Sequence, residues 1–132
     1  MSERLACLTL VVRDYDEAIR YFTESLGFVL LEDSPRPGGK RWARVAPRGV
    51  PTVSILLAQA ASPEQAEAIG RHAGGRVGLF LHTDNFMATY QRFRQRGVVF
   101  LEAPRTEAYG TVVVFQDLYG NKWDLIQPTE GG

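Results

Sequence analysis

The chain has 132 residues, of which 45% are hydrophobic and 23% charged, and its 15 basic and 15 acidic side chains cancel to a formal net charge of zero. This composition excludes a disordered chain and is typical of a protein long enough to bury a core. The zero charge argues against nucleic acid or a membrane surface as a partner. With one cysteine, no signal-like start and no long apolar run, we expect a cytoplasmic protein.

The sequence contains a repeat at a separation of 70 residues. Six of the 19 residues in positions 14–32 recur 70 positions later, where chance gives roughly one. The recurring residues are Asp14, Ala18, Gly27, Val29, Leu31 and Glu32. Both stretches combine a helical pattern, a glycine and a short apolar strand. We therefore predict two modules, over 5–60 and 76–128, joined by a connector over 61–75.

The first module is predicted to have the order β-α-β-β-β. Asp14 is expected to cap the helix, with Glu17 as its reciprocal capping partner, and Gly27 is expected to end it. The expected strands are 5–12, 28–32, 41–46 and 52–58.

The second module repeats this order after a short connector helix that opens at Ser62. Its helix is predicted over 85–96, with Met87, Tyr90 and Phe93 facing inward. The expected strands are 76–83, 98–103, 111–116 and 122–127.

Strand alternation separates two faces of each expected sheet. In the first strand, Leu10 and Val12 are expected under the helix, so Cys7 and Thr9 face the opposite, concave side. In the last strand, Asp124 and Trp123 point to opposite faces. A carboxylate in so apolar a strand must be paired or exposed to a wet cavity, because burying it alone costs several kcal/mol. Asp124 is therefore a candidate for a pocket.

The segment Phe115-Gln116-Asp117-Leu118-Tyr119-Gly120-Asn121-Lys122-Trp123-Asp124-Leu125, together with the opening from Val12 to Phe28, resembles the vicinal oxygen chelate superfamily. This group contains glyoxalase I, extradiol dioxygenases, and fosfomycin-resistance and bleomycin-resistance proteins. The similarity covers about residues 5–128. It implies an α+β fold, in which two tandem βαβββ modules form a curved, barrel-like mixed sheet around a cavity. Residues 1–132 are then a single glyoxalase-like domain.

The resemblance also implies four positions where metal enzymes of the superfamily place their ligands. In this sequence they carry Cys7, Ser54, Gly78 and Asp124. An exact 70-residue shift would pair Cys7 with Val77 rather than with Gly78, and a one-residue bulge would explain this offset. A divalent ion of this class needs three or four nitrogen or oxygen ligands. We therefore expect a degenerate site with no metal ligands and no cofactor. His82 could join the set only if its strand were strongly bent.

Asp124 and His82 are the candidate catalytic residues. The candidate ligand-binding residues are Cys7, Thr9, Trp42, Ser54, Gln59, Phe80, Arg105, Tyr109 and Trp123. Each also has a structural interpretation: a cysteine or tryptophan can be core, a histidine can be hydrogen-bonded in place, and Arg105 can pair with Glu107. Basic residues around Trp42 either hold an anionic ligand group or protect a strand edge.

We expect a homodimer that binds a small molecule without a metal, as in the bleomycin-resistance branch that the sequence resembles. A second hypothesis is a metal-dependent lyase or dioxygenase with Asp124 in an unusual ligand set. A third is a metal-free lyase or isomerase that uses Asp124 or His82 for proton transfer.

Overall fold

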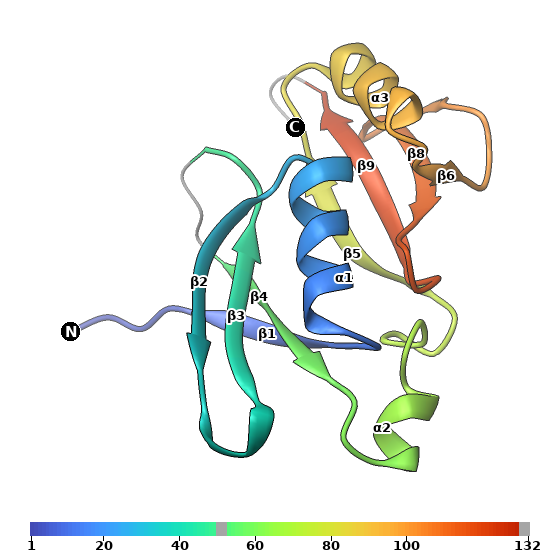
Figure 1. Cartoon of the computed structure of the whole chain (residues 1–132). Helices are drawn as coiled ribbons and strands as arrows, with labels where there is room; N and C mark the ends of the chain where they lie inside the picture. Colours follow the sequence, from blue (N-terminus) through green and yellow to red (C-terminus); the bar gives the residue numbers. More distant parts are fainter. Residues whose placement is uncertain (50–52, 130–132) are drawn as a thin grey trace. The chain divides into compact units, whose positions relative to one another are not determined.

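The computed structural model describes residues 1–49 and 53–129. The chain divides into two compact units, Met1–Ile69 and Gly70–Gly132, and each builds its own sheet (Figure 1). Within the described ranges, every helix is too short or too polar to cross a lipid bilayer.

The first unit has a four-stranded sheet in the order β1-β4-β3-β2. Strand β1 runs parallel to β4, and the other neighbours are antiparallel. Helix α1 contacts β3 and β4. The elements are β1 (Cys7–Val12), α1 (Tyr15–Arg20), a π-helical turn (Tyr21–Ser25), β2 (Val29–Pro35), a 3-10 turn (Pro37–Gly39), β3 (Arg41–Ala46), β4 (Ser54–Gln59) and α2 (Pro63–Glu67).

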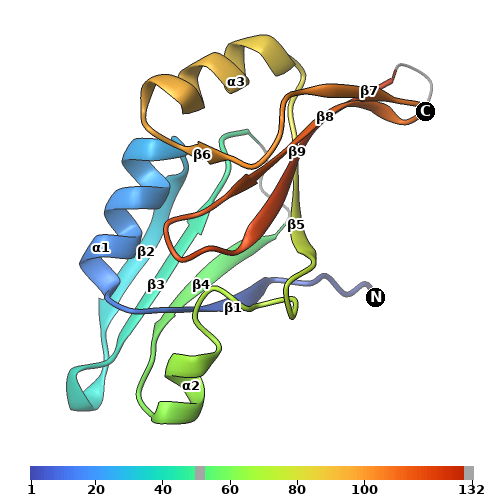
Figure 2. The same cartoon turned by 90° about the vertical axis from the view of Figure 1, so that its right-hand side faces the viewer.

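The second unit has the sheet order β5-β9-β8-β6, with β7 also paired to β8 (Figure 2). Strand β5 runs parallel to β9, and the other pairs are antiparallel. The elements are β5 (Val77–His82), α3 (Phe86–Gln95), β6 (Val99–Phe100), β7 (Arg105–Glu107), β8 (Gly110–Gln116) and β9 (Lys122–Pro128).

The predicted α+β class and the tandem βαβββ order are confirmed, with differences in detail: the expected strand 98–103, for example, is reduced to β6, Val99–Phe100. The described residues form two open sheets, whereas we expected one barrel-like sheet. The second unit gains β7, because Gly110, at a φ of 150° that favours glycine, lets the chain fold back on β8. Strand β2 continues to Pro35 and forms a hairpin with β3, whereas we expected this strand to end at residue 32. Thr52, the expected start of β4, lies outside the described residues.

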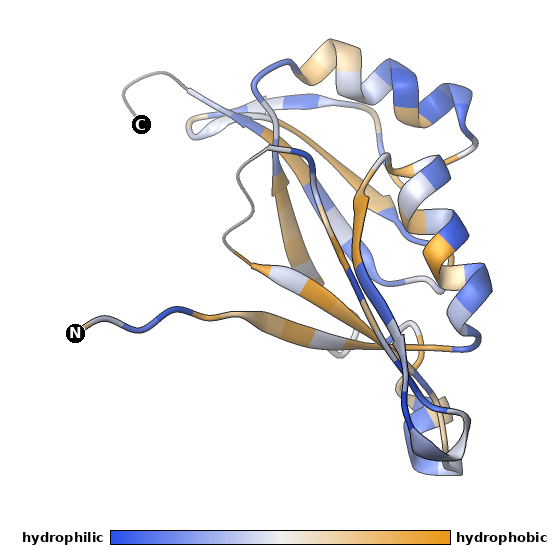
Figure 3. Ribbon diagram, turned by 60° about the vertical axis from the view of Figure 1, so that its left-hand side comes forward, coloured by the Kyte–Doolittle hydropathy of each residue, from blue (hydrophilic) through white to orange (hydrophobic). Residues whose placement is uncertain are grey.

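Each helix packs on one face of its sheet. Leu10 and Val12 of β1 and Leu57 of β4 are fully buried on the face that α1 covers. In the second unit Phe93 of α3 packs edge-on against Phe115 of β8, with ring centroids 5.4 Å apart. Figure 3 shows β1, next to the labelled N-terminus, coloured mostly hydrophobic, whereas the C-terminal half of α3 is mostly hydrophilic.

Met87 does not face inward as predicted, because it is 54% exposed. The buried stripe of α3 consists of Phe86, Thr89 and Phe93, which recur at helical spacing. Tyr90, at the edge of this stripe, stacks on Phe86 and contacts Phe100 of β6.

Both long helices begin with the same two contacts. In α1 the Asp14 carboxylate accepts a hydrogen bond from the Glu17 amide at 2.8 Å, and the Gln59 side-chain oxygen accepts one from the Tyr15 amide at 3.3 Å. These contacts satisfy amides that a helix N-terminus leaves without an intrahelical partner.

In α3 the Asn85 side chain accepts from the Ala88 amide at 3.2 Å, and the Gln127 oxygen accepts from the Phe86 amide at 2.7 Å. In each unit a glutamine at the end of the last strand thus fixes the start of the helix. The sequence interpretation identified the Asp14 cap but neither glutamine contact.

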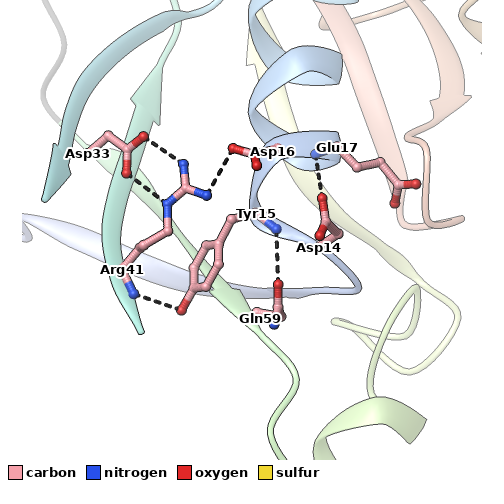
Figure 4. A network of polar contacts seen from close by, with 7 residues as sticks. All are labelled: Asp14, Tyr15, Asp16, Glu17, Asp33, Arg41 and Gln59. Atoms are coloured by element: carbon pink, nitrogen blue, oxygen red, sulfur yellow. Dashed lines mark hydrogen bonds and ion pairs between the residues drawn. The ribbon is translucent and has the colours of Figure 1, made fainter. Parts of the chain in front are cut away.

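Arg41 of β3 ties the β2–β3 hairpin to α1 (Figure 4). Its guanidinium donates to Asp33 of β2 at 2.7 and 3.1 Å and to Asp16 of α1 at 2.9 Å. The Tyr15 hydroxyl accepts from the Arg41 amide at 3.2 Å. The hydrogen bonds from Arg41 hold the pKa of Asp33 below its usual value. Arg41, one of the basic residues near Trp42, is therefore engaged in a structural contact.

The Asp33→Asn variant is expected to lower the free energy of unfolding by about 1 kcal/mol at neutral pH, because it breaks a bidentate ion pair. The folded-state pKa of Asp33 lies below the unfolded value of about 3.9, so this contribution is present above pH 4 and is lost as the pH falls through the folded pKa. Urea unfolding across this range measures it. The exposed Asp84, changed to Asn, is the matched control, and an equal loss in both variants would contradict the assignment.

Candidate functional site

Strand β9 has one face against α3 and an opposite face on which Asp124 and Ile126 are buried. The Trp123 ring stacks on Phe115 with centroids 5.6 Å apart, and Phe115 in turn contacts Phe93 of α3. Because successive side chains point to opposite faces, Asp124 lies on the face away from α3. In the register of the sheet, Phe80 of β5 and Val114 of β8 lie beside Asp124. We call this surface the Asp124 face.

Asp124 is only 9% exposed, and its Oδ1 atom is buried without a hydrogen-bond partner among the described residues. Burial raises the pKa of this carboxyl, since a low-dielectric environment disfavours the charged form. The positive charge of Arg105 acts in the opposite direction, and the negative charge of Glu102 adds to the rise in pKa. A desolvated acid whose acceptor atom has no hydrogen-bond partner is typical of a functional site.

Arg105, on β7, is held by two acids. Its Nε donates to Glu102 at 3.0 Å and its Nη1 donates to Glu107 at 2.6 Å, which is the pairing that the sequence allowed. Tyr109 also hydrogen-bonds Arg105, and these contacts raise the pKa of the guanidinium. Glu102 additionally accepts from the Val114 amide at 3.1 Å, which fixes it to β8. Arg105 is therefore held in place near Asp124.

Two predicted ligand-binding aromatics are exposed in this unit. Phe80 is 62% exposed on β5, and Tyr109 is 49% exposed in the turn between β7 and β8. An exposed phenylalanine beside a buried acid combines an apolar contact surface with a polar anchor, as small-molecule sites do.

Trp123 was expected to bind ligand, and the structure places it elsewhere. It is 3% exposed, on the α3 side of the sheet, and its indole N–H donates to Asp117 at 3.0 Å. The same Asp117 carboxylate accepts from the amides of Tyr119 and Asn121, both at 3.0 Å, and from the Asn121 side chain at 3.1 Å. Asp117 therefore holds the β8–β9 turn, a role that sequence reasoning missed although the Asp-x-x-Gly-Asn turn signature indicates it.

The first unit has a related open face on β1, β3 and β4. Cys7 and Ser54 are paired in the register of β1 and β4, and the exposed Thr9 follows on the same face. Arg44 of β3 donates to the Ser54 hydroxyl at 3.1 Å and to Glu32 at 3.3 Å. This places three predicted ligand-binding residues on one face: Cys7, Thr9 and Ser54.

Trp42 is 37% exposed on β3, and the Arg36 guanidinium lies 5.8 Å from its ring centroid. The Trp42 ring is accessible, and Arg36, the cation beside it, lies in the turn between β2 and β3. Gln59 does not lie on the open face as a ligand-binding residue, because its side-chain oxygen caps α1.

The 70-residue repeat relates the two faces. Glu32 and Glu102 are equivalent, and each binds an arginine. Ser54 and Asp124 are also equivalent, and each lies near that arginine. In the first unit Arg44 donates to the Ser54 hydroxyl as well as to Glu32, whereas in the second unit Arg105 donates to Glu102 and Glu107. The Asp124 Oδ1 atom has no donor among the described residues.

The register of β5 shifts between Val77 and Leu79, so the one-residue bulge that the sequence indicated at Gly78 is confirmed. His82, at the end of β5, is exposed and lies two residues from Phe80, on the Asp124 face. It pairs in register with Ile126 rather than with Asp124. Among residues 1–49 and 53–129, no three His, Cys, Asp or Glu side chains are grouped so that they could hold a metal ion.

A family model described as Glyoxalase/Bleomycin resistance protein/Dioxygenase superfamily matches residues 4–125, and the chain belongs to this superfamily. An uncharacterized protein of Shewanella frigidimarina (strain NCIMB 400) is 49% identical over 128 residues, which cover 96% of this chain and 95% of that protein. The crystal structure of UcmS2 is similar at 37% identity and a TM-score of 0.82, covering 96% of this chain and 98% of that one. The structure of TnmS3, an antibiotic binding protein from Streptomyces sp. CB03234, is similar at 31% identity and a TM-score of 0.77, covering 97% and 98%.

The Asp124→Asn variant is expected to be at least as stable as the wild type at neutral pH, because it removes a buried charge whose folded pKa is raised. The sign follows from linkage: the ionised carboxylate costs stability above its folded pKa, and this cost disappears below the unfolded value of about 3.9. Thermal unfolding at neutral and acidic pH measures the difference. A large loss of stability at neutral pH would indicate that Asp124 is a structural acid instead.

Proposed function

We propose that this protein binds a small molecule on the Asp124 face without the help of a metal ion. The observation that carries the proposal is the combination of an unpartnered buried carboxylate oxygen with an exposed aromatic ring, Phe80, on the neighbouring strand. An apolar surface supplies contact area, and a few convergent polar groups give orientation and specificity.

The residues at the four metal-ligand positions support a site without metal. Gly78 has no side chain, and a Cβ added there would meet the Ala73 Cβ at 2.6 Å. The Ser54 hydroxyl is engaged by Arg44 at 3.1 Å. Asp124 remains as the one carboxylate, and a divalent ion of this class requires several nitrogen or oxygen ligands. The donor set therefore does not fit a divalent cation, and we assign no step to one.

The class of ligand that we propose is an antibiotic-like molecule with an aromatic group. TnmS3, which shares 31% identity with this chain, is an antibiotic binding protein. In this chain the exposed rings of Phe80 and Tyr109 offer surfaces on which a planar group can stack. The role would be sequestration rather than turnover.

Binding is tested by thermal unfolding of the protein with bleomycin and, separately, tetracycline, each before and after treatment with EDTA. At a hundredfold excess over its Kd, a bound antibiotic stabilises the folded protein by about 2.7 kcal/mol. We expect stabilisation by at least one of the two, unchanged by EDTA and reduced in Phe80→Ala.

The matched control is Met87→Ala, which removes an exposed apolar side chain from α3 instead of from the Asp124 face. This variant should retain the full stabilisation. Stoichiometric zinc, nickel, iron or manganese in the purified protein, together with loss of binding after EDTA, would contradict the proposal and favour a metal-dependent lyase or dioxygenase.

A further inference from the structure

We propose that the ligand of the Asp124 face carries a protonated amine next to an aromatic group, and that Asp124 binds this amine. The inference rests on the proposed function, since it specifies the chemistry of the molecule bound at the same face. Four observations about the described residues lead to it.

The first observation is the carboxylate itself. Asp124 is 9% exposed, and neither of its oxygens accepts a hydrogen bond from a described residue, although buried carboxylates normally have partners. Rotation about the Cβ–Cγ bond exchanges the two oxygens, so that either one can meet a donor. A ligand group that donates to Asp124 would supply the missing contact.

The second observation is the charge around this acid. Asp124, Glu102 and Glu107 contribute three carboxylates, and Arg105 contributes one guanidinium, which leaves a formal charge of two negative. Arg105 is already bound by both glutamates at 3.0 and 2.6 Å. The group therefore repels an anionic ligand and attracts a cationic one.

The third observation is the comparison that the internal repeat provides. At position 54 of the first unit, a neutral hydroxyl accepts a hydrogen bond from Arg44. At the equivalent position 124, the acid is present but the arginine is held by glutamates instead. The same fold thus satisfies this position internally in one unit and leaves it open to an external donor in the other.

The fourth observation is the aromatic ring beside the acid. Phe80 pairs with Asp124 in the register of β5 and β9 and is 62% exposed. An ammonium group close to an aromatic face is attracted by the ring quadrupole, and a flat ligand group can stack there. Together the ring and the acid select a cationic aromatic molecule.

The test uses three probes that differ in one group: naphthylmethylamine, naphthalenemethanol and naphthoate. Backbone amide NMR titration of the full chain follows the resonances of Phe80, Val114 and Asp124. We expect the amine to bind about tenfold more tightly than the alcohol, because it adds a charged hydrogen bond, and naphthoate to bind most weakly.

Two variants distinguish a specific contact between Asp124 and the amine from a general effect of the negative charge of the protein. In Asp124→Asn the amine and alcohol affinities should become equal within roughly twofold. Asp84→Asn makes the same charge change at an exposed position of the same unit and should keep the preference for the amine. Phe80→Ala should weaken both the amine and the alcohol, because both lose the stacking surface, and should weaken the amine more, because it also loses the attraction of the ring for the ammonium. The amide spectrum of each variant reports whether it is folded.

The outcomes distinguish this inference from the proposed function. If the alcohol binds as tightly as the amine in the wild type, or if Asp124→Asn retains the preference, the amine inference is overturned while binding on this face stands. If no probe shifts these three resonances, both the inference and the assignment of the binding face are overturned.

Discussion

The buried Asp117 carboxylate is the contact on which the second unit depends. It lies in the turn between β8 and β9 and accepts hydrogen bonds from two turn amides, one asparagine side chain and the indole of Trp123. The contact fixes the Trp123 ring on the α3 side of the sheet. Because strand residues alternate, the same contact places Asp124 on the opposite face. A structural acid thus determines where the candidate functional acid lies.

Asp117 and Asp124 show how the presence or absence of hydrogen-bond partners distinguishes a structural buried acid from a candidate functional one. Asp117 and Asp124 are both buried, at 3% and 9% exposure. Asp117 accepts hydrogen bonds from its own turn and from Trp123 of β9, whereas burial raises the pKa of Asp124. A buried acid that the fold does not satisfy is therefore the more informative one for function.

Much of the fold could be predicted because its signals are local. The segment that forms β3 has the predicted bounds, Arg41–Ala46, and Gly27 follows the first helix with a positive φ as expected. Strand β7 could not be predicted, because three residues rich in charge become a strand only by pairing with β8. The inward side of α3 was misassigned at Met87 because the pattern starting at Phe86 fits the helical period equally well.

The candidate site was predictable only in part. Asp124 was identified as a candidate because it is a charged residue within an otherwise apolar strand. This pattern can be read directly from the sequence. The pairing of Arg105 with Glu107 was only one of the alternatives that the sequence offered. The role of Gln59 as a cap of α1 depends on where β4 ends relative to that helix. Such contacts join residues far apart in the sequence, and single-sequence patterns do not report them.

The bulge at Gly78 has a consequence for how this chain can change over time. A side chain at this position would collide with the Cβ of Ala73, which is a short group on the adjoining loop and cannot swing aside. Installing a histidine or glutamine there would thus require a second change that moves the loop. A side chain at position 78, which any coordinating residue there would need, therefore meets a steric barrier that a substitution at this position alone does not remove.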